Sequence, residues 1–270
     1  MIPVGFAYER PETLNGALAL LAEHGEDAKV LAGGHSLLPV MKLRLAAPEL
    51  LIDIGRLGEL RYQRVEGDEL AVGAGSRHRD LEMSDVVRAE APLLAAVART
   101  VGDPQVRHRG TIGGSLGHAD PASDLPAAVL ALGGDVVLRG PRGERRVPVS
   151  RLFTGVFSTV MEPDELLVEV RLPRTGAAGW AYEKFTRRAN DWAIVGVAVV
   201  AGRVGLVNMG VTPLRAAATE AALARGASIE EAAALAAEGT DPPTDLAGTK
   251  EYRRHLARVL TRRALATATS

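Results

Sequence analysis

The spacing of apolar residues over the first sixty positions predicts a β–α–β unit. Thr13 stands before a run whose apolar residues recur every three or four positions, which is typical of a capped helix with one buried face. Short apolar runs at 30–31 and 50–54 predict strands, and the segment 36–45 between them predicts another helix. We therefore expect a first lobe over residues 1–57.

The pattern then changes to short strands mixed with helices, which predicts an α+β arrangement. The expected elements are a hairpin over 60–73, helices over 80–101 and 125–132, a second hairpin over 135–149 and a strand over 165–172. Residues 173–179 contain proline and glycines and are the best linker candidate. Strands at 180–186, 193–200 and 204–209, followed by three short helices, are expected beyond it. The predicted domains are 1–175, with lobes of about 1–57 and 58–175, and 176–270.

Composition narrows the class of protein. A hydrophobic content of 47% in 270 residues is ample for a core, and a net charge of −1 argues against a nucleic-acid binder. No apolar run approaches the roughly 20 residues needed to span a membrane, and no secretory signal pattern is visible, so we expect a cytoplasmic protein. The chain has no cysteine and therefore no thiolate with which to hold an iron–sulfur cluster.

Two glycine-rich segments carry the candidate chemistry. The first is the strand-like run Lys29-Val30-Leu31 followed by Ala32-Gly33-Gly34-His35-Ser36-Leu37, and the second is Thr111-Ile112-Gly113-Gly114-Ser115. Paired glycines allow a positive φ and a close approach of backbone N–H groups to a ligand. A strand, glycines and a helix in succession point several N–H groups at an anion. Two such segments, each with a hydroxyl side chain, predict a pyrophosphate held from both sides.

These segments resemble the FAD-binding (medium) subunit of the molybdenum hydroxylases, the family of carbon monoxide dehydrogenase and xanthine dehydrogenase-like enzymes. The resemblance extends to the opening run 8–14, to residues 103–110 before the second segment and to residues 184–193, and it covers essentially the whole chain. Ser115 stands where the family often has asparagine. The resemblance implies an α+β fold, in which a two-lobed PCMH-type FAD-binding domain precedes a small C-terminal domain of antiparallel sheet plus helices.

The resemblance also implies the cofactors and partners. It implies FAD on this chain, a molybdenum–pterin centre on a large subunit and two iron–sulfur clusters on a small subunit, assembled as a heterohexamer that passes electrons to an external acceptor. It adds Asp124, Leu167, Lys184 and Trp192 to the two glycine segments as FAD contacts. It implies no catalytic base and no metal site on this chain, because the substrate is oxidised on the large subunit.

Simpler roles remain open for several of these residues. Asp124 is also compatible with a helix N-cap, Lys184 with a solvent-facing strand position and Trp192 with ordinary core packing. His35 either contacts the cofactor or orients its own turn. For the whole chain, the alternatives are a free-standing FAD-dependent oxidase of the vanillyl-alcohol-oxidase-like fold and a non-enzymatic flavin-binding assembly module.

Overall fold

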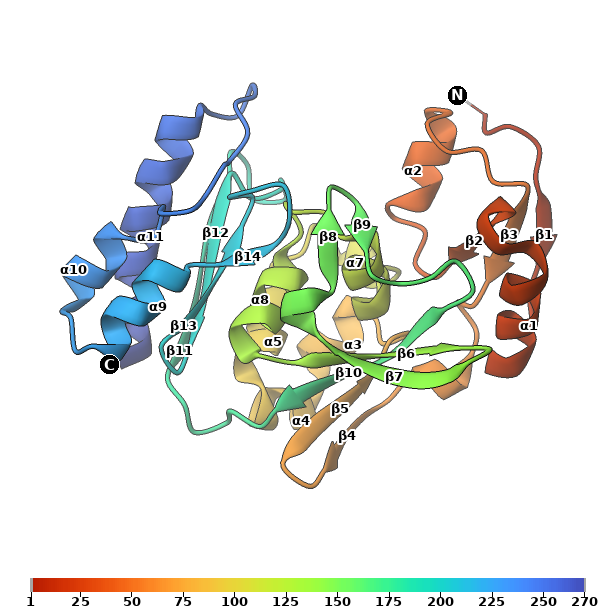
Figure 1. Cartoon of the computed structure of the whole chain (residues 1–270), viewed down its shortest axis with the longest axis horizontal. Helices are drawn as coiled ribbons and strands as arrows, with labels where there is room; N and C mark the ends of the chain where they lie inside the picture. The colour runs from red at the N-terminus through yellow and green to blue at the C-terminus, as the bar shows by residue number, and fades with distance from the viewer. Residues whose placement is uncertain (1, 270) are drawn as a thin grey trace.

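The computed structural model describes residues 2–269, and its N-terminal lobe is built on a three-stranded parallel sheet of order β1–β3–β2 (Figure 1). The elements of this lobe are β1 (Ala7–Glu9), α1 (Leu14–His24), β2 (Ala28–Leu31), α2 (Leu37–Lys42) and β3 (Leu50–Asp53), with 3-10 turns at Gly25–Asp27 and Gly58–Leu60. The predicted cap of α1 is confirmed, because the Gly16 N–H donates to Thr13 Oγ1 at 3.1 Å. Helix α2 is shorter than predicted, since the backbone becomes left-handed at Arg44, with a φ of 59°.

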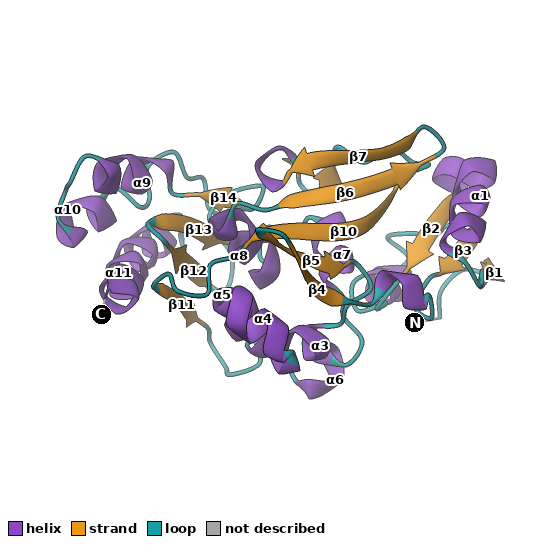
Figure 2. Ribbon diagram, turned by 90° about the horizontal axis from the view of Figure 1, so that it is seen from below, coloured by secondary structure: helices purple, strands orange, loops and turns teal. Residues whose placement is uncertain are grey.

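The second lobe carries a five-stranded antiparallel sheet of order β4–β5–β10–β6–β7. Its strands are β4 (Gln63–Glu66), β5 (Glu69–Gly73), β6 (Asp135–Gly140), β7 (Gly143–Pro148) and β10 (Leu166–Pro173). Its helices are α3 (His78–Met83), α4 (Asp85–Glu90), α5 (Pro92–Arg99), α6 (Pro104–Arg107), α7 (Ile112–His118) and α8 (Asp124–Leu132). A 3-10 turn at Val149–Arg151 leads to the small hairpin β8 (Phe153–Gly155) and β9 (Ser158–Thr159). Figure 2 shows α3, α4 and α5 on one side of the sheet, where leucine, valine and alanine side chains form a continuous core.

The C-terminal domain is a four-stranded antiparallel sheet covered on one face by helices. Its elements are β11 (Trp180–Phe185), β12 (Val195–Val200), β13 (Arg203–Val207), β14 (Leu214–Arg215), α9 (Ala217–Ala224), α10 (Ile229–Ala234) and α11 (Lys250–Thr269). Successive residues of β12 face opposite sides of the sheet. Val197 and Val199 therefore pack in the cluster that includes α11, whereas Ala198 and Val200 join the core of the second lobe.

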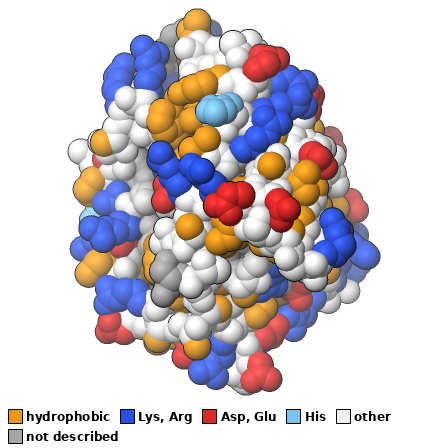
Figure 3. Space-filling view, turned by 90° about the vertical axis from the view of Figure 1, so that its left-hand side faces the viewer, with side chains coloured by type: hydrophobic (Ala, Val, Ile, Leu, Met, Phe, Trp, Pro, Cys, Tyr) orange, Lys and Arg blue, Asp and Glu red, His pale blue; other side chains and the backbone are white. Residues whose placement is uncertain are grey.

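The α+β class predicted from the sequence is confirmed by this arrangement. The prediction of three short C-terminal helices is wrong for α11, whose 20 residues contain no helix breaker and bury one apolar face against the sheet. Figure 3 shows the C-terminal end of the molecule, where basic, acidic and apolar side chains are interspersed. Among residues 2–269, no helix combines the length and the apolar character needed to cross a bilayer.

Candidate functional site

The first glycine segment forms a turn between β2 and α2 in which successive backbone N–H groups have no hydrogen-bond acceptor among the described residues. Gly34 has a φ of 77°, a left-handed conformation that glycine adopts without strain. Within the described residues, 2–269, the backbone N–H groups of Gly33, Gly34, His35 and Ser36 have no hydrogen-bond acceptor. Consecutive N–H groups without partners form a concave site for an anion. The residues of this turn therefore fit a phosphate group.

The second glycine segment lies in the first turn of a helix instead of in a loop. Thr111 is the N-cap of α7, and its hydroxyl accepts the Gly114 N–H at 3.1 Å. The Gly113 N–H donates to the Ala74 carbonyl at 2.9 Å, and the Ile112 N–H donates to Ser76 at 3.0 Å. The positive φ predicted for this pair is wrong, because neither glycine has one. The fold already uses these N–H groups, so the Ser115 hydroxyl is the more available donor.

The two segments nevertheless lie against each other. A Cβ placed on Gly33 would be 2.8 Å from Gly110 Cα, so the first turn packs directly on the loop that leads into α7. A Cβ on Gly113 would be 2.6 Å from Ala74 Cβ, which fixes α7 against the end of β5. These glycines are required because backbone approaches backbone, and the first turn therefore lies close to the N-terminal end of α7. Figure 1 shows α7 between α2 and α8, the helix that carries Asp124.

A buried ion pair joins α8 to the C-terminal domain. Lys184 Nζ donates to Asp124 Oδ2 at 2.8 Å and to the Thr100 carbonyl at 3.0 Å, and the Tyr182 hydroxyl donates to Asp124 Oδ1. The side chains of Lys184 and Asp124 are only 10% and 6% exposed. The alternative of a solvent-facing Lys184 is therefore wrong. The capping alternative for Asp124 is wrong too, because Ser123 is the N-cap of α8.

Burial controls the titration of this cluster. It raises the pKa of Asp124, while the charge of Lys184 and the hydrogen bonds from Lys184 and Tyr182 oppose that shift. Burial and the neighbouring Asp124 raise the pKa of Tyr182 well above its usual value. Tyr182 was not among the residues predicted from the sequence, and only its place two residues before Lys184 in the same strand could have indicated it.

The remaining predicted contacts are placed individually. Trp192 is 60% exposed in the loop between β11 and β12, so the core-packing alternative is wrong. Leu167 is buried in the core of the second lobe and pairs with Leu138 of β6. Lys29 is exposed on β2, while Val30 packs against the core of the first lobe.

His35 is exposed and lies near a second histidine that sequence reasoning missed. His78, the first residue of α3, is buried and its Nδ1 atom has no partner among the described residues. Burial, together with the charges of His35 and Arg107, lowers the pKa of His78 to about 4. A Cβ on Gly110 would lie 2.6 Å from His78 Nε2, so this ring supports the loop before α7.

Comparisons with known proteins identify the family of this chain. Residues 4–175 match the family described as "FAD binding domain in molybdopterin dehydrogenase", and residues 180–268 match "CO dehydrogenase flavoprotein C-terminal domain". The chain is 44% identical to the carbon monoxide dehydrogenase medium chain of Hydrogenophaga pseudoflava, over 98% of this chain and 97% of that one. It is 40% identical to the carbon monoxide dehydrogenase medium chain of Afipia carboxidovorans, with 98% and 97% covered.

The likeness extends to three dimensions. A solved structure of carbon monoxide dehydrogenase from Hydrogenophaga pseudoflava superimposes with a TM-score of 0.95 at 46% identity, covering 100% of this chain and 99% of that one. The sequence match and the structural match therefore both run along almost the entire chain. This chain belongs to the FAD-binding family of the molybdopterin dehydrogenases, and it is an oxidoreductase subunit.

Proposed function

We propose that this chain is the FAD-binding electron-transfer subunit of a heterotrimeric molybdenum hydroxylase. In this role it stands between iron–sulfur clusters on a partner subunit and an external electron acceptor. The observation that carries the proposal is the turn at 33–36, whose four N–H groups lack acceptors in the described chain. An FAD diphosphate supplies acceptor oxygens of the kind that these donors fit. FAD, when bound, supplies the ability to exchange electrons with both a donor and an acceptor.

The proposed roles of the side chains follow from their places in the fold. The turn at 33–36 and the Ser115 hydroxyl hold the diphosphate between them. Lys184 holds a positive charge in a largely buried position, where it can stabilise negative charge on a reduced ring. Asp124 fixes the direction of the Lys184 ammonium and reduces its net field. Trp192, exposed beside the same strand, offers a flat surface that can cover one face of the ring.

The absence of cysteine supports the proposed division of labour between subunits. A chain without thiolates relies on another chain for iron–sulfur clusters. We infer a large molybdenum–pterin subunit and a small iron–sulfur subunit as partners, in a cytoplasmic heterohexamer with two copies of each chain. The substrate is then chosen on the large subunit, and this chain needs no general base or nucleophile.

The first experiment tests whether the cofactor is FAD held without a covalent bond. The subunit is purified alone and with its partners, and its colour is followed through acid precipitation. We expect the yellow colour to appear in the supernatant and to be FAD, because the chain has no cysteine for a thioether link. FMN in the supernatant, or colour that stays in the pellet, would contradict the proposal.

The second experiment separates this subunit's step from substrate oxidation. Stopped-flow absorbance of the assembled enzyme follows cluster bleaching and flavin reduction as separate signals. We expect a Lys184 or Ile112 substitution to slow flavin turnover or shift its potential, and to leave reduction of the molybdenum centre by substrate unchanged. Substrate oxidation by the isolated chain, without a metal-containing partner, would favour the free-standing oxidase instead.

A further inference from the structure

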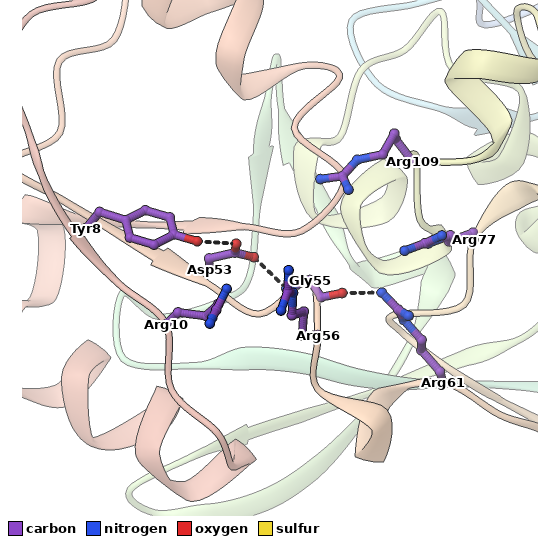
Figure 4. A pocket seen from close by; sticks show the side chains of 8 residues that line it. All are labelled: Tyr8, Arg10, Asp53, Gly55, Arg56, Arg61, Arg77 and Arg109. Carbon is purple, nitrogen blue, oxygen red and sulfur yellow. Dashed lines mark hydrogen bonds between the residues drawn. The ribbon is translucent and has the colours of Figure 1, made fainter.

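Five arginines converge on one cavity between the two lobes of the FAD-binding domain (Figure 4). The cavity has a volume of about 470 Å³. Its lining residues are Tyr8, Arg10, Asp53, Gly55, Arg56, Arg61, Arg77 and Arg109. Arg10 precedes α1 and Arg56 follows β3, whereas Arg77 and Arg109 come from the second lobe. These side chains are far apart in the sequence, and only the fold brings them together.

No salt bridge neutralises the five arginines of this cavity among residues 2–269, although the carboxylate of Asp80 acts on Arg61 from outside the lining. Among residues 2–269, many arginines form ion pairs, as Arg145 does with Glu165, but none of the five in the cavity does. The one carboxylate in the lining, Asp53, accepts hydrogen bonds from the Tyr8 hydroxyl at 2.6 Å and from the Gly55 N–H at 2.7 Å. The arginines therefore leave four positive charges in excess.

Concentrated positive charge makes the cavity a site for an anion. Burial lowers the pKa of Arg61 and the charge of Arg77 lowers it further, the carboxylate of Asp80 opposes this shift, and the charge of Arg109 adds to it. The side chain of Arg61 is already held by the Gly55 carbonyl. A bound anion would remove the repulsion among the others. Guanidinium groups pair with carboxylate and with phosphate through two parallel hydrogen bonds, and a phosphate group has more oxygens and more charge for several arginines to share.

We propose that this cavity binds a nucleoside polyphosphate, separately from FAD. An excess of four positive charges matches two or more phosphate groups, and a volume of about 470 Å³ lies in the range of small-molecule sites. Tyr8, which is 49% exposed, offers an aromatic surface on which a base can stack. The ligand would bridge the two lobes, because arginines from both lobes contact it. This inference goes beyond the proposed function.

The cavity is distinct from the proposed FAD diphosphate site but shares a wall with it. None of Gly33, Gly34, His35 and Ser36 lines the cavity, although these residues carry the unpaired N–H groups. A smaller adjoining recess is lined by Ala32 and Thr111, which are the first residues of the two glycine segments. Arg61, Arg77 and Arg109 line both the cavity and this recess, so the two ligands would be neighbours.

The test uses the assembled, flavin-loaded complex and isothermal titration calorimetry. The probes are ADP, inorganic pyrophosphate and adenosine. We expect ADP to bind more tightly than pyrophosphate, adenosine to give no measurable heat, and affinity for ADP to fall as the salt concentration rises. Arg56→Gln and Arg109→Gln should each weaken ADP binding by about tenfold, because each removes charge-assisted hydrogen bonds. Arg88→Gln is the matched control, since that exposed arginine lies outside the cavity and pairs only with the exposed Asp85.

Four outcomes would overturn the proposal. ADP that displaces FAD, seen as loss of flavin absorbance, would mean that the cavity is part of the FAD site. Equal affinity for ADP and pyrophosphate would show that the nucleoside contributes nothing to binding. Absence of ADP binding would show that the cavity is not a nucleotide site. Binding to the free chain but not to the assembled complex would indicate that an acidic segment of a partner fills the cavity. Flavin content and thermal unfolding of each variant are measured alongside, so a folding defect or a failure to bind FAD is recognised separately.

Discussion

Replacing Gly33 by alanine tests whether the two glycine segments must touch for FAD to bind. The new Cβ would lie 2.8 Å from Gly110 Cα and closer still to the Arg109 carbonyl oxygen, where ordinary contact begins at 3.4 Å. The segments would have to separate by about 0.6 Å or more, because backbone atoms cannot rotate away. Overpacking of this kind costs about 2 kcal/mol. That corresponds to a fall in Tm of roughly 4–8 °C in a chain of this size.

The same displacement moves the donors of the turn away from the second segment. We expect FAD affinity to fall by at least about tenfold, which corresponds to the loss of one charge-assisted hydrogen bond. The assay titrates flavin-free protein with FAD and follows quenching of flavin fluorescence, with calorimetry for Tm. Gly58→Ala is the matched control, since its Cβ would meet nothing within 4 Å. Gly33→Ala protein with the Tm and FAD affinity of the wild type would refute the reasoning.

Three further predictions concern the rest of the site. Thr111→Val removes the cap of α7 and should lower the free energy of unfolding by about 1 kcal/mol in urea, whereas Thr111→Ser should restore most of it. Lys184→Met leaves Asp124 buried without its cation, so we expect the free energy of unfolding to fall by about 3–5 kcal/mol near neutral pH. This loss should shrink as acid protonates Asp124, and an unchanged urea midpoint would contradict the prediction. The pKa of His78 is about 4 in the folded chain against 6.5 as the ordinary value, so the unfolded state binds more protons between these values. Stability should therefore fall by up to about 3 kcal/mol as pH drops from about 6.5 to 4, and His78→Gln should lack this component.

Local signals in the sequence were enough to predict α1, β2 and β3 of the first lobe, whereas β1 was missed. The cap at Thr13 and the apolar spacing behind it specify α1 through contacts within a few residues. Strand β2, before the first glycine segment, could also be predicted, because a short apolar run bounded by glycine favours a strand. In both cases the residues that specify the element lie within or next to it in the sequence.

Long-range features could not be predicted in this way. Helix α7 contains Gly113, Gly114 and Ser115, which have low helix propensity, and it is stabilised by the cap at Thr111 and by the buried Ile112. The arginine cavity was missed because its members are spread over a hundred positions and look like ordinary surface charges. The family resemblance indicated Asp124 and Lys184 separately as FAD contacts, but their ion pair was missed, since a single sequence does not reveal that α8 packs on the C-terminal sheet.

β10 is the central strand of the second lobe, so the five-stranded sheet can form only after β10 has been synthesised. The hairpins β4–β5 and β6–β7 bond to each other only through β10, although β10 is the last of the five strands to be synthesised. During translation, the first lobe has all its strands once residue 53 has emerged, whereas both hairpins keep an unpaired edge until residue 173 has emerged. A ribosome that stalls between residues 148 and 173 displays both glycine segments together with two open sheet edges. Chaperone demand and aggregation of nascent chains should therefore be greatest in that interval, and cofactor loading should begin only after it ends.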